Sequence, residues 1–300
     1  MSSQALPGES PARPIAYEGL GRPIRGPRAL TDDWSRFWHL TYNIARNEFK
    51  LRFFGSILGY LWQLVRPLLL FAVLYVFFTK VALVNKQHGP GQEHYGAQLL
   101  ASIVLFTFFA EATSGAVRSV VDRENLVRKI QFPRLVIPLS VVLLALFNLA
   151  LNLIVVLGFA LGEGVQPMLS WLELPLIVGM LAILATGVAM LLSALFVSFR
   201  DIQPIWDVVS QILFYASPVI ISVETVKLKL GSTLLHLYML NPLAVAFQQF
   251  RHAVITHGTL SVDQVTGVWT PIGALAIVLA VFALGFWVFN RSAPLVAENL

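Results

Sequence analysis

The residues of this chain that could do chemistry include two ionisable groups placed inside long apolar stretches. Arg66 lies about seven residues into one stretch, and Glu111 lies seven residues before Arg118 in the next. A helical rise of about 1.5 Å per residue places both roughly 10 Å from the same membrane surface. Because charges at that depth are costly unless paired or hydrated, we predict that Arg66 and Glu111 form an intramembrane ion pair or gate. Snorkelling of Arg66 to the surface is the alternative.

Other reactive side chains are few. Asn148 and Asn152 are four residues apart, hence on one helix face, where hydrogen bonds between helices are their commoner use in membranes. Five histidines lie in connections between apolar stretches: His88, His94, His236, His252 and His257. No two of them have the spacing of zinc ligands beside a carboxylate. The chain has no cysteine and no Gly-x-x-x-x-Gly-Lys-Ser/Thr phosphate loop. We therefore expect no catalytic residue, no metal site and no bound cofactor in this chain.

The composition indicates that most of the chain is surrounded by membrane lipid and not by water. Hydrophobic residues make up 57% of the 300 residues and charged residues only 12%, where a soluble domain carries roughly a quarter charged. Ranges such as 135–162, 174–199 and 264–290 contain no charge and exceed the about 20 residues that cross a hydrocarbon core. The sequence therefore predicts an all-α integral membrane protein. Its predicted spans are near 58–83, 96–117, 135–162, 173–199, 204–223 and 267–290.

The basic residues predict the orientation of these six spans. They gather before the first span and in alternate connections: Arg46, Lys50, Arg52, Arg66, Arg118, Arg123, Arg128, Lys129, Arg134, Arg200 and Arg291. Cytoplasmic segments near span ends are enriched in Lys and Arg, so both termini are expected in the cytoplasm. The net charge is +5, but the basic residues that produce it lie beside the spans and not on a soluble face. Their location argues against a nucleic acid partner.

The N-terminal region divides into two parts. Residues 1–30 have no apolar core, so they are neither a signal peptide nor a span, and we expect a disordered cytoplasmic tail. Residues 34–54 mix aromatic and basic side chains, which is typical of an amphipathic helix in the membrane interface. A soluble amphipathic helix packed on a partner is the alternative.

Two connections have unusual composition. The external connection 224–266 holds two apolar pieces, 232–240 and 243–255, separated by the helix-starting dipeptide Asn241-Pro242. Neither piece can span, so 231–256 is expected to be either a re-entrant hairpin in the outer leaflet between spans five and six or an external cap. The cytoplasmic segment 121–131 is charged and amphipathic and ends before Pro133. A solvated connection would have the same pattern.

Several motifs in order resemble one family. They are the segment 46–62 with Pro67, the segment 124–134, Phe199-Arg200-Asp201, Ser217-Pro218, and Asn241-Pro242 with Arg251. Residues 31–300 resemble, as one transmembrane domain, the permeases of type-2 ABC exporters. The branch in question exports lipid-linked polysaccharides such as O-antigen, capsule, teichoic acid or other cell-wall glycans.

The resemblance implies an assembly and a set of functional residues. It implies a homodimer in the cytoplasmic membrane of a bacterium, in contact with membrane lipids and joined to two copies of a separate ATPase that uses ATP and Mg. Segment 121–131 would be the coupling helix, with a shorter second contact near the fourth span. The implied coupling residues are Asp122, Arg123, Glu124, Asn125, Leu126, Arg128, Lys129, Arg200 and Asp201. Tyr75 and Tyr215 would line a sugar path, although lipid-facing placement is the default for such aromatics.

Three other functions fit the same topology less well. An ABC exporter of drugs or small lipids would share the six spans but needs no long continuous channel. A membrane-embedded enzyme that transfers glycan or phosphate groups should gather carboxylates or histidines at a membrane face, and the external connections hold few. A structural anchor would not need the polar residues found within the spans.

Overall fold

The computed structural model describes residues 34–53, 57–81, 94–123, 133–256 and 258–292. Within these ranges all regular structure is helical, and no strand occurs. The helices are α1 (Trp34–Phe53), α2 (Ile57–Val76), η1 (Phe77–Val81), α3 (Tyr95–Val117), α4 (Ser119–Asp122), α6 (Val136–Gly162), η3 (Leu169–Glu173), α7 (Leu174–Ser198), α8 (Ile202–Ala216), α9 (Val223–Met239), α10 (Pro242–Phe250), η4 (Arg251–Ile255), α11 (Val262–Thr266) and α12 (Trp269–Ser292). The predicted all-α class is confirmed for this part of the chain.

Five segments of the described chain are long and apolar enough to cross a membrane. They are Leu61–Val81, Tyr95–Val117, Val136–Gly162, Leu169–Ser198 and Trp269–Ser292, and they correspond to five of the six predicted spans. The predicted span 204–223 overlaps α8, whose 15 residues rise by only about 22 Å, less than the core thickness of about 30 Å. The count of six crossings therefore stays a prediction.

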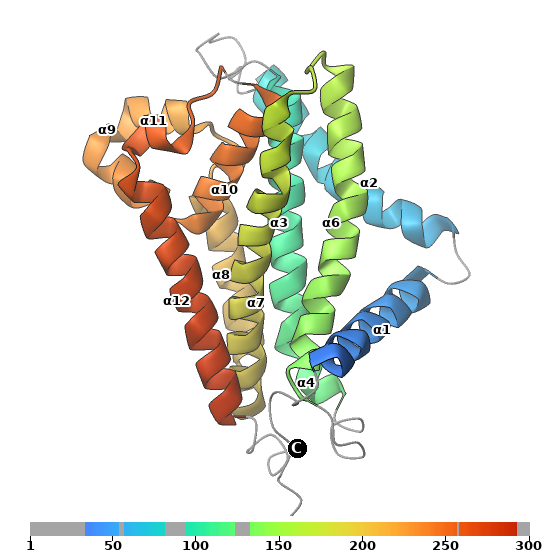
Figure 1. Ribbon diagram of the computed structural model, residues 1–300. Coiled ribbons are helices and arrows are strands. Elements are labelled where there is room, and N and C mark those ends of the chain that lie inside the picture. The colour runs from blue at the N-terminus through green and yellow to red at the C-terminus, as the bar shows by residue number, and fades with distance from the viewer. Residues whose placement is uncertain (1–33, 54–56, 82–93, 124–132, 257, 293–300) are drawn as a thin grey trace, which may run out of the picture.

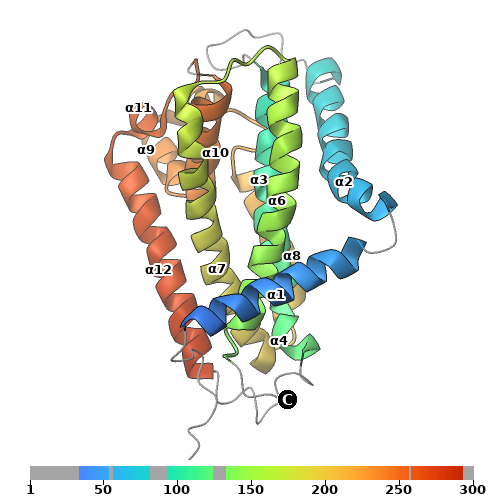
Figure 2. The ribbon, with the colours of Figure 1, turned by 45° about the vertical axis from the view of Figure 1, so that its right-hand side comes forward.

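Helix α3 forms the centre of the bundle. It packs against α2, α6, α7 and α8, and most of its residues are buried. Its residues are apolar all round and not on one face only, which is typical of a helix enclosed by others. Helix α2 lies at the edge of the bundle (Figure 2), and only 11% of its most apolar stretch, within Leu61–Val81, is buried. Most of the α2 surface must therefore be covered by lipid or by another chain.

Helix α1 runs across one end of the bundle, over α6 (Figure 2). Phe37, Thr41 and Ala45 are buried at a spacing of four residues, so they form the face that packs inward. Trp34 and Trp38 are exposed. An amphipathic helix is thus present at the predicted position, ending at Phe53, while its location in the membrane interface stays a prediction.

Helices α9, α10 and α11 gather at the end of the bundle opposite α4 (Figure 1). We call these two ends the α10 end and the α4 end. Asn241 caps α10, because its side-chain oxygen accepts a hydrogen bond from the backbone N–H of Leu243 at 3.0 Å. The predicted Asn-Pro start of a second short helix is confirmed. Helix α9 begins at Val223, earlier than the apolar piece 232–240, and entry of this pair into the membrane stays a prediction.

Helices α7 and α12 approach each other closely at two glycines. A Cβ atom on Gly187 would lie 2.7 Å from the Cα atom of Phe282, and one on Gly285 would collide with the backbone carbonyl of Gly187. Small residues let helix backbones pack closely in membranes, where van der Waals contact drives association. Gly187 and Gly285 therefore allow the backbones of α7 and α12 to approach this closely.

We expect Gly285→Ala to destabilise this helix pair. The added methyl group meets backbone, which cannot rotate away, so the free energy of unfolding should fall by about 1 to 3 kcal/mol. Gly179→Ala on α7 is the matched control, because a Cβ there meets nothing within 4 Å. The measurement is thermal unfolding of both variants in the same detergent. Equal midpoints for the two variants would contradict the close approach.

Candidate functional site

Arg123 joins three elements at the α4 end. It follows α4, forms an ion pair with Glu48 of α1, and donates to the backbone carbonyl of Ile137 at 3.4 Å and to Ser140 Oγ at 3.3 Å at the start of α6. The side chains of Arg123 and Glu48 are 19% and 28% exposed, and this burial lowers the pKa of Arg123 from its ordinary value. A pair that is partly shielded from water is stronger than a surface pair. Arg123 therefore couples the position of α1 to that of α6.

A second contact at the α4 end centres on Phe196 near the end of α7. The guanidinium carbons of Arg118 and Arg200 lie 5.8 and 5.4 Å from the centroid of this ring, within the range of a cation–π interaction. Arg118 Nε also donates to Gln203 Oε1 of α8 at 2.6 Å. The connection that follows α3 is thereby joined to the connection between α7 and α8.

The predicted coupling residues are only partly visible. Asp122, Arg200 and Asp201 are exposed at the α4 end, and Arg123 is held as described above. Five others lie outside the described residues: Glu124, Asn125, Leu126, Arg128 and Lys129. The described part of the first predicted segment, with Asp122 and Arg123, lies at the same end of the bundle as Arg200 and Asp201 (Figure 1), and their role in coupling stays a prediction.

Glu111 of α3 has partners other than the one that the sequence predicts. Its Oε1 accepts a hydrogen bond from Gln63 of α2 at 2.8 Å, and its Oε2 accepts one from Asn148 of α6 at 3.2 Å. Arg66 is exposed and forms no ion pair with Glu111 in this structure, where two side-chain amides donate to the carboxylate. The snorkelling alternative agrees with an exposed Arg66, and a gating role for Arg66 stays a prediction.

Asn148 and Asn152 use their hydrogen bonds differently. The bond from Asn148 to Glu111 joins α6 to α3, as predicted for helix packing. Asn152 Nδ2 instead donates to the backbone carbonyl of Asn148 within the same helix at 2.9 Å. Glu111 with its two amide partners therefore holds together α2, α3 and α6 in the middle of the bundle.

Arg251 is the principal polar group at the α10 end, and it is 2% exposed. Its Nη2 donates to Ser102 Oγ of α3 at 3.0 Å, to the carbonyl of Val219 at 3.1 Å and to the carbonyl of Pro218. These carbonyls belong to the break between α8 and α9. Backbone groups without a partner are very costly away from water, so Arg251 stabilises the point where α8 stops.

A second buried network fixes α9 and α10 beside this break. Gln248 Nε2 donates to Glu224 Oε1 at 3.1 Å and to the carbonyl of Leu260 at 2.7 Å. The backbone N–H of Leu260 in turn donates to Glu224 at 3.2 Å. The sequence analysis missed Glu224 and Gln248. A signal was present, since both are polar residues in a connection that is otherwise rich in apolar residues.

The two tyrosines assigned to a sugar path lie in different surroundings. Tyr75 is half-buried, with its ring centroid 6.4 Å from that of Tyr95 and 5.3 Å from that of Phe71. Tyr215 is 75% exposed and meets Phe214 edge-on at 5.3 Å. Only Tyr215 thus presents most of its ring surface outside this single chain, and the sugar path stays a prediction.

Three charged side chains of this bundle join elements that are distant in sequence. The contacts of Arg123, Glu111 and Arg251 each connect elements distant in sequence. Among the residues that the structure describes, no three His, Asp or Glu side chains are grouped so that they could hold a metal ion. These contacts fix the positions of the connected helices relative to one another.

We expect Arg251→Met to destabilise the α10 end strongly. The change keeps the length of the side chain but leaves the carbonyls of Pro218 and Val219 without donors, which should cost about 2 kcal/mol or more. Lys227→Met is the control, because Lys227 is an exposed cation on α9. Thermal unfolding in detergent compares the two variants. A loss no larger than that of the control would show that Arg251 does not support the break.

Comparison with known proteins identifies relatives over most of the chain. The family model described as ABC-2 type transporter matches residues 39–255, from within α1 to the end of η4. The chain is 29% identical over 258 residues to an O-antigen export system permease protein RfbA of Klebsiella pneumoniae, covering 86% of this chain and 93% of that protein. A second K. pneumoniae protein of that name is 28% identical over 239 residues, covering 78% and 88%. One from Myxococcus xanthus is 27% identical over 218 residues, covering 73% and 81%.

Proposed function

The chain belongs to the ABC-2 type transporter family, and we propose that it is the membrane-spanning permease subunit of an ATP-driven exporter of a lipid-linked polysaccharide. The observation that carries this proposal is the similarity of most of the chain to proteins named as O-antigen export permeases. The five long apolar helices support a multi-pass protein of a bacterial cytoplasmic membrane. The family is one of transporter membrane subunits, which favours transport over a glycan- or phosphate-transferring enzyme.

Energy enters the permease at the α4 end. The sequence has no phosphate-binding loop, so two copies of a separate ATPase subunit bind and hydrolyse ATP with Mg. They contact segment 121–131 and the second site at Arg200 and Asp201. The ion pair between Arg123 and Glu48 supports this role, because it connects the start of the coupling segment to α1 and α6.

The α4 end faces the cytoplasm in this proposal. Basic residues adjoin the helix ends there, including Arg118, Arg200 and Arg291, in agreement with the positive-inside rule. Helix α8 and the chain that follows it make the sixth crossing, so the start of α1 and the end of α12 lie on the same side. Figure 1 supports this by placing both at one end of the bundle.

Two copies of this chain form the permease. Helices α2 and α8 both pack on α3 and carry large exposed apolar side chains, including Trp62 at 63%, Val73 at 67% and Ile212 at 60%. Such faces suit contact with a second copy and with a sugar path between the copies, to which Tyr75 and Tyr215 contribute. Aromatic rings can slide along sugars without fixing one hydrogen-bond pattern.

The α10 end forms the outer side of the path. Helices α9 and α10 are too short to span, and the turn between them is tied to the bundle because Asn241 Nδ2 donates to Ser217 Oγ at 3.0 Å. A turn shielded by protein can enter the hydrocarbon region, so this pair is the re-entrant hairpin where cargo leaves. An exporter of drugs or small lipids is the second candidate, favoured only if no polysaccharide depends on this chain.

The transport proposal is tested in a strain lacking this chain. We expect lipid-linked polysaccharide to accumulate inside the cell and surface polysaccharide to disappear, and we expect a plasmid copy of the gene to restore export. Gel analysis and surface labelling of the polysaccharide measure both effects. Unchanged surface polysaccharide in the strain that lacks the chain would contradict the proposal.

The coupling role of Arg123 is tested by reversing its ion pair in the same strain. We expect Arg123→Glu and Glu48→Arg each to lower export at least about tenfold, because each places like charges together. The double variant should recover a large part of the activity, since it restores the pair with opposite polarity. Lys80→Glu, at an exposed position of η1, is the control. Normal export in both single variants at equal membrane levels would exclude this role.

A further inference from the structure

Three charged side chains lie well inside the apolar part of the described chain. At least five residues from either end of the five long apolar segments and of α8, they are Arg66 of α2, Glu111 of α3 and Asp207 of α8. Glu111 accepts hydrogen bonds from Gln63 and Asn148. Arg66 and Asp207 are exposed on this single chain, and neither has a hydrogen bond or an ion pair with another described residue. One cation and one anion therefore lack a partner.

Both charges lie among exposed apolar side chains. Arg66 shares the outer face of α2 with Trp62 and Val73, and Asp207 shares the exposed side of α8 with Val208. A charge in such surroundings is costly in a membrane unless it is paired or hydrated. The long side chain of Arg66 can extend toward the membrane surface, but the short side chain of Asp207 cannot. A cation must therefore come to Asp207.

Hydrogen bonds to α3 place the two charges at similar depths. Gln63, three residues before Arg66, donates to Glu111 at 2.8 Å. The tryptophan that directly precedes Asp207 donates to Thr113 Oγ1 at 3.2 Å. These two acceptors are two residues apart on α3, a rise of about 3 Å, and Arg66 and Asp207 lie about 4.5 and 1.5 Å further toward the α10 end. The resulting offset of about 6 Å is within reach of a flexible arginine side chain.

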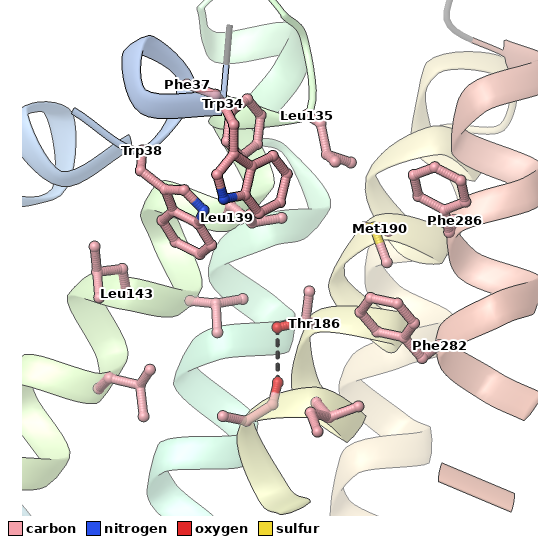
Figure 3. A pocket seen from close by; sticks show the side chains of 14 residues that line it. Trp34, Phe37, Trp38, Leu135, Leu139, Leu143, Thr186, Met190, Phe282 and Phe286 are labelled. Carbon is pink, nitrogen blue, oxygen red and sulfur yellow. Dashed lines mark hydrogen bonds between the residues drawn. The ribbon is translucent and has the colours of Figure 1, made fainter. Parts of the chain in front are cut away.

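Another exposed region of the bundle offers no such complementarity of charge. A cavity of about 460 Å³ lies between α1, α6, α7 and α12, and Figure 3 shows its aromatic and aliphatic lining. None of the described residues that line it is charged. Its one hydroxyl group, on Thr186, already donates to the backbone carbonyl of Ala182 at 2.7 Å. Charge therefore distinguishes the exposed faces of α2 and α8 from this region.

We propose that a second copy of this chain covers the exposed faces of α2 and α8, and that Arg66 of each copy forms an ion pair with Asp207 of the other. A two-fold axis forms every contact between copies twice, so both cations and both anions find partners of opposite charge. The inference rests on the proposed function, in which α8 takes part in a crossing and two copies form the permease. It assigns the residues that join the copies.

Cross-linking between copies tests the contact. The chain has no cysteine, so an Arg66→Cys chain and a differently tagged Asp207→Cys chain are produced together and treated in membranes with a short thiol-specific cross-linker. We expect a covalent dimer that carries both tags, and the second ion pair of that dimer stays intact. Arg66→Cys with Leu279→Cys is the control, because Leu279 is exposed on α12, at the opposite edge of the bundle from α2 (Figure 1). Equal cross-linking in both combinations, or none in the first, would overturn the proposal.

Charge reversal distinguishes an ion pair from simple proximity. We expect Arg66→Asp and Asp207→Arg each to lower the dimeric fraction of the purified chain at least about fivefold, because like charges then meet. The double variant should recover most of the dimer, and Lys80→Asp, at an exposed position of η1, should leave it unchanged. Light scattering after size-exclusion chromatography measures the fraction. If Arg66 bound a phosphate group of cargo or lipid instead, Asp207→Arg would not change the dimer and the double variant would not recover, which would overturn the proposal.

These measurements are independent of transport, because they use purified chain or membranes from cells that make no lipid-linked polysaccharide. A dimer that forms through another face would overturn the ion pair between Arg66 and Asp207 while leaving the export proposal standing. Unchanged surface polysaccharide in the strain that lacks the chain would contradict export, and the cross-linked dimer would still support the ion pair. The two proposals can therefore fail separately.

Discussion

A helix that stops inside an apolar bundle leaves carbonyl groups without donors, and this structure meets that constraint with Arg251. Its guanidinium serves the carbonyls of Pro218 and Val219 and also reaches Ser102 on α3. Arg251 thus supplies donors to two carbonyls of the segment that directly follows Ala216, where α8 ends, and backbone groups away from water need such partners. The whole α10 end depends on this, since α9 and α10 can fold back beside the bundle only where α8 has stopped.

The two ends of the bundle are built differently around a common core. At the α10 end Arg251 is buried and donates to backbone carbonyls, which favours one fixed arrangement. At the α4 end Arg123 and Glu48 are partly exposed and pair side chain with side chain. The contact between Arg118 and Gln203 joins the connection that follows α3 directly to α8. Helices α2 and α8 have few buried residues. A shift of either helix would therefore break fewer packing contacts than a shift of α3.

Features set by one local pattern could be predicted from the sequence, and features set by several distant segments could not. Length and hydropathy located the five long apolar helices among the six predicted spans, because crossing a bilayer is a property of consecutive residues. The N-cap preference of Asn241 predicted the start of α10. The contacts of Gln63 and Asn148 with Glu111 were not predicted, since charge and depth do not specify which of two residues one turn apart faces α3. The supporting role of Arg251 was missed because its acceptors are about 32 residues away in the chain.

The central claim is that the α4 end is where an ATPase subunit binds. The chain has no cysteine, so single cysteines can be introduced as unique attachment points for a short cross-linker. The most direct measurement is cross-linking in membranes of Asp122→Cys and Asp201→Cys, with Gly258→Cys at the α10 end as the control, followed by identification of the attached protein. The account predicts that an ATP-hydrolysing subunit attaches at the first two positions and not at the third. Attachment of that subunit at Gly258→Cys alone, or at none of the three positions, would contradict it.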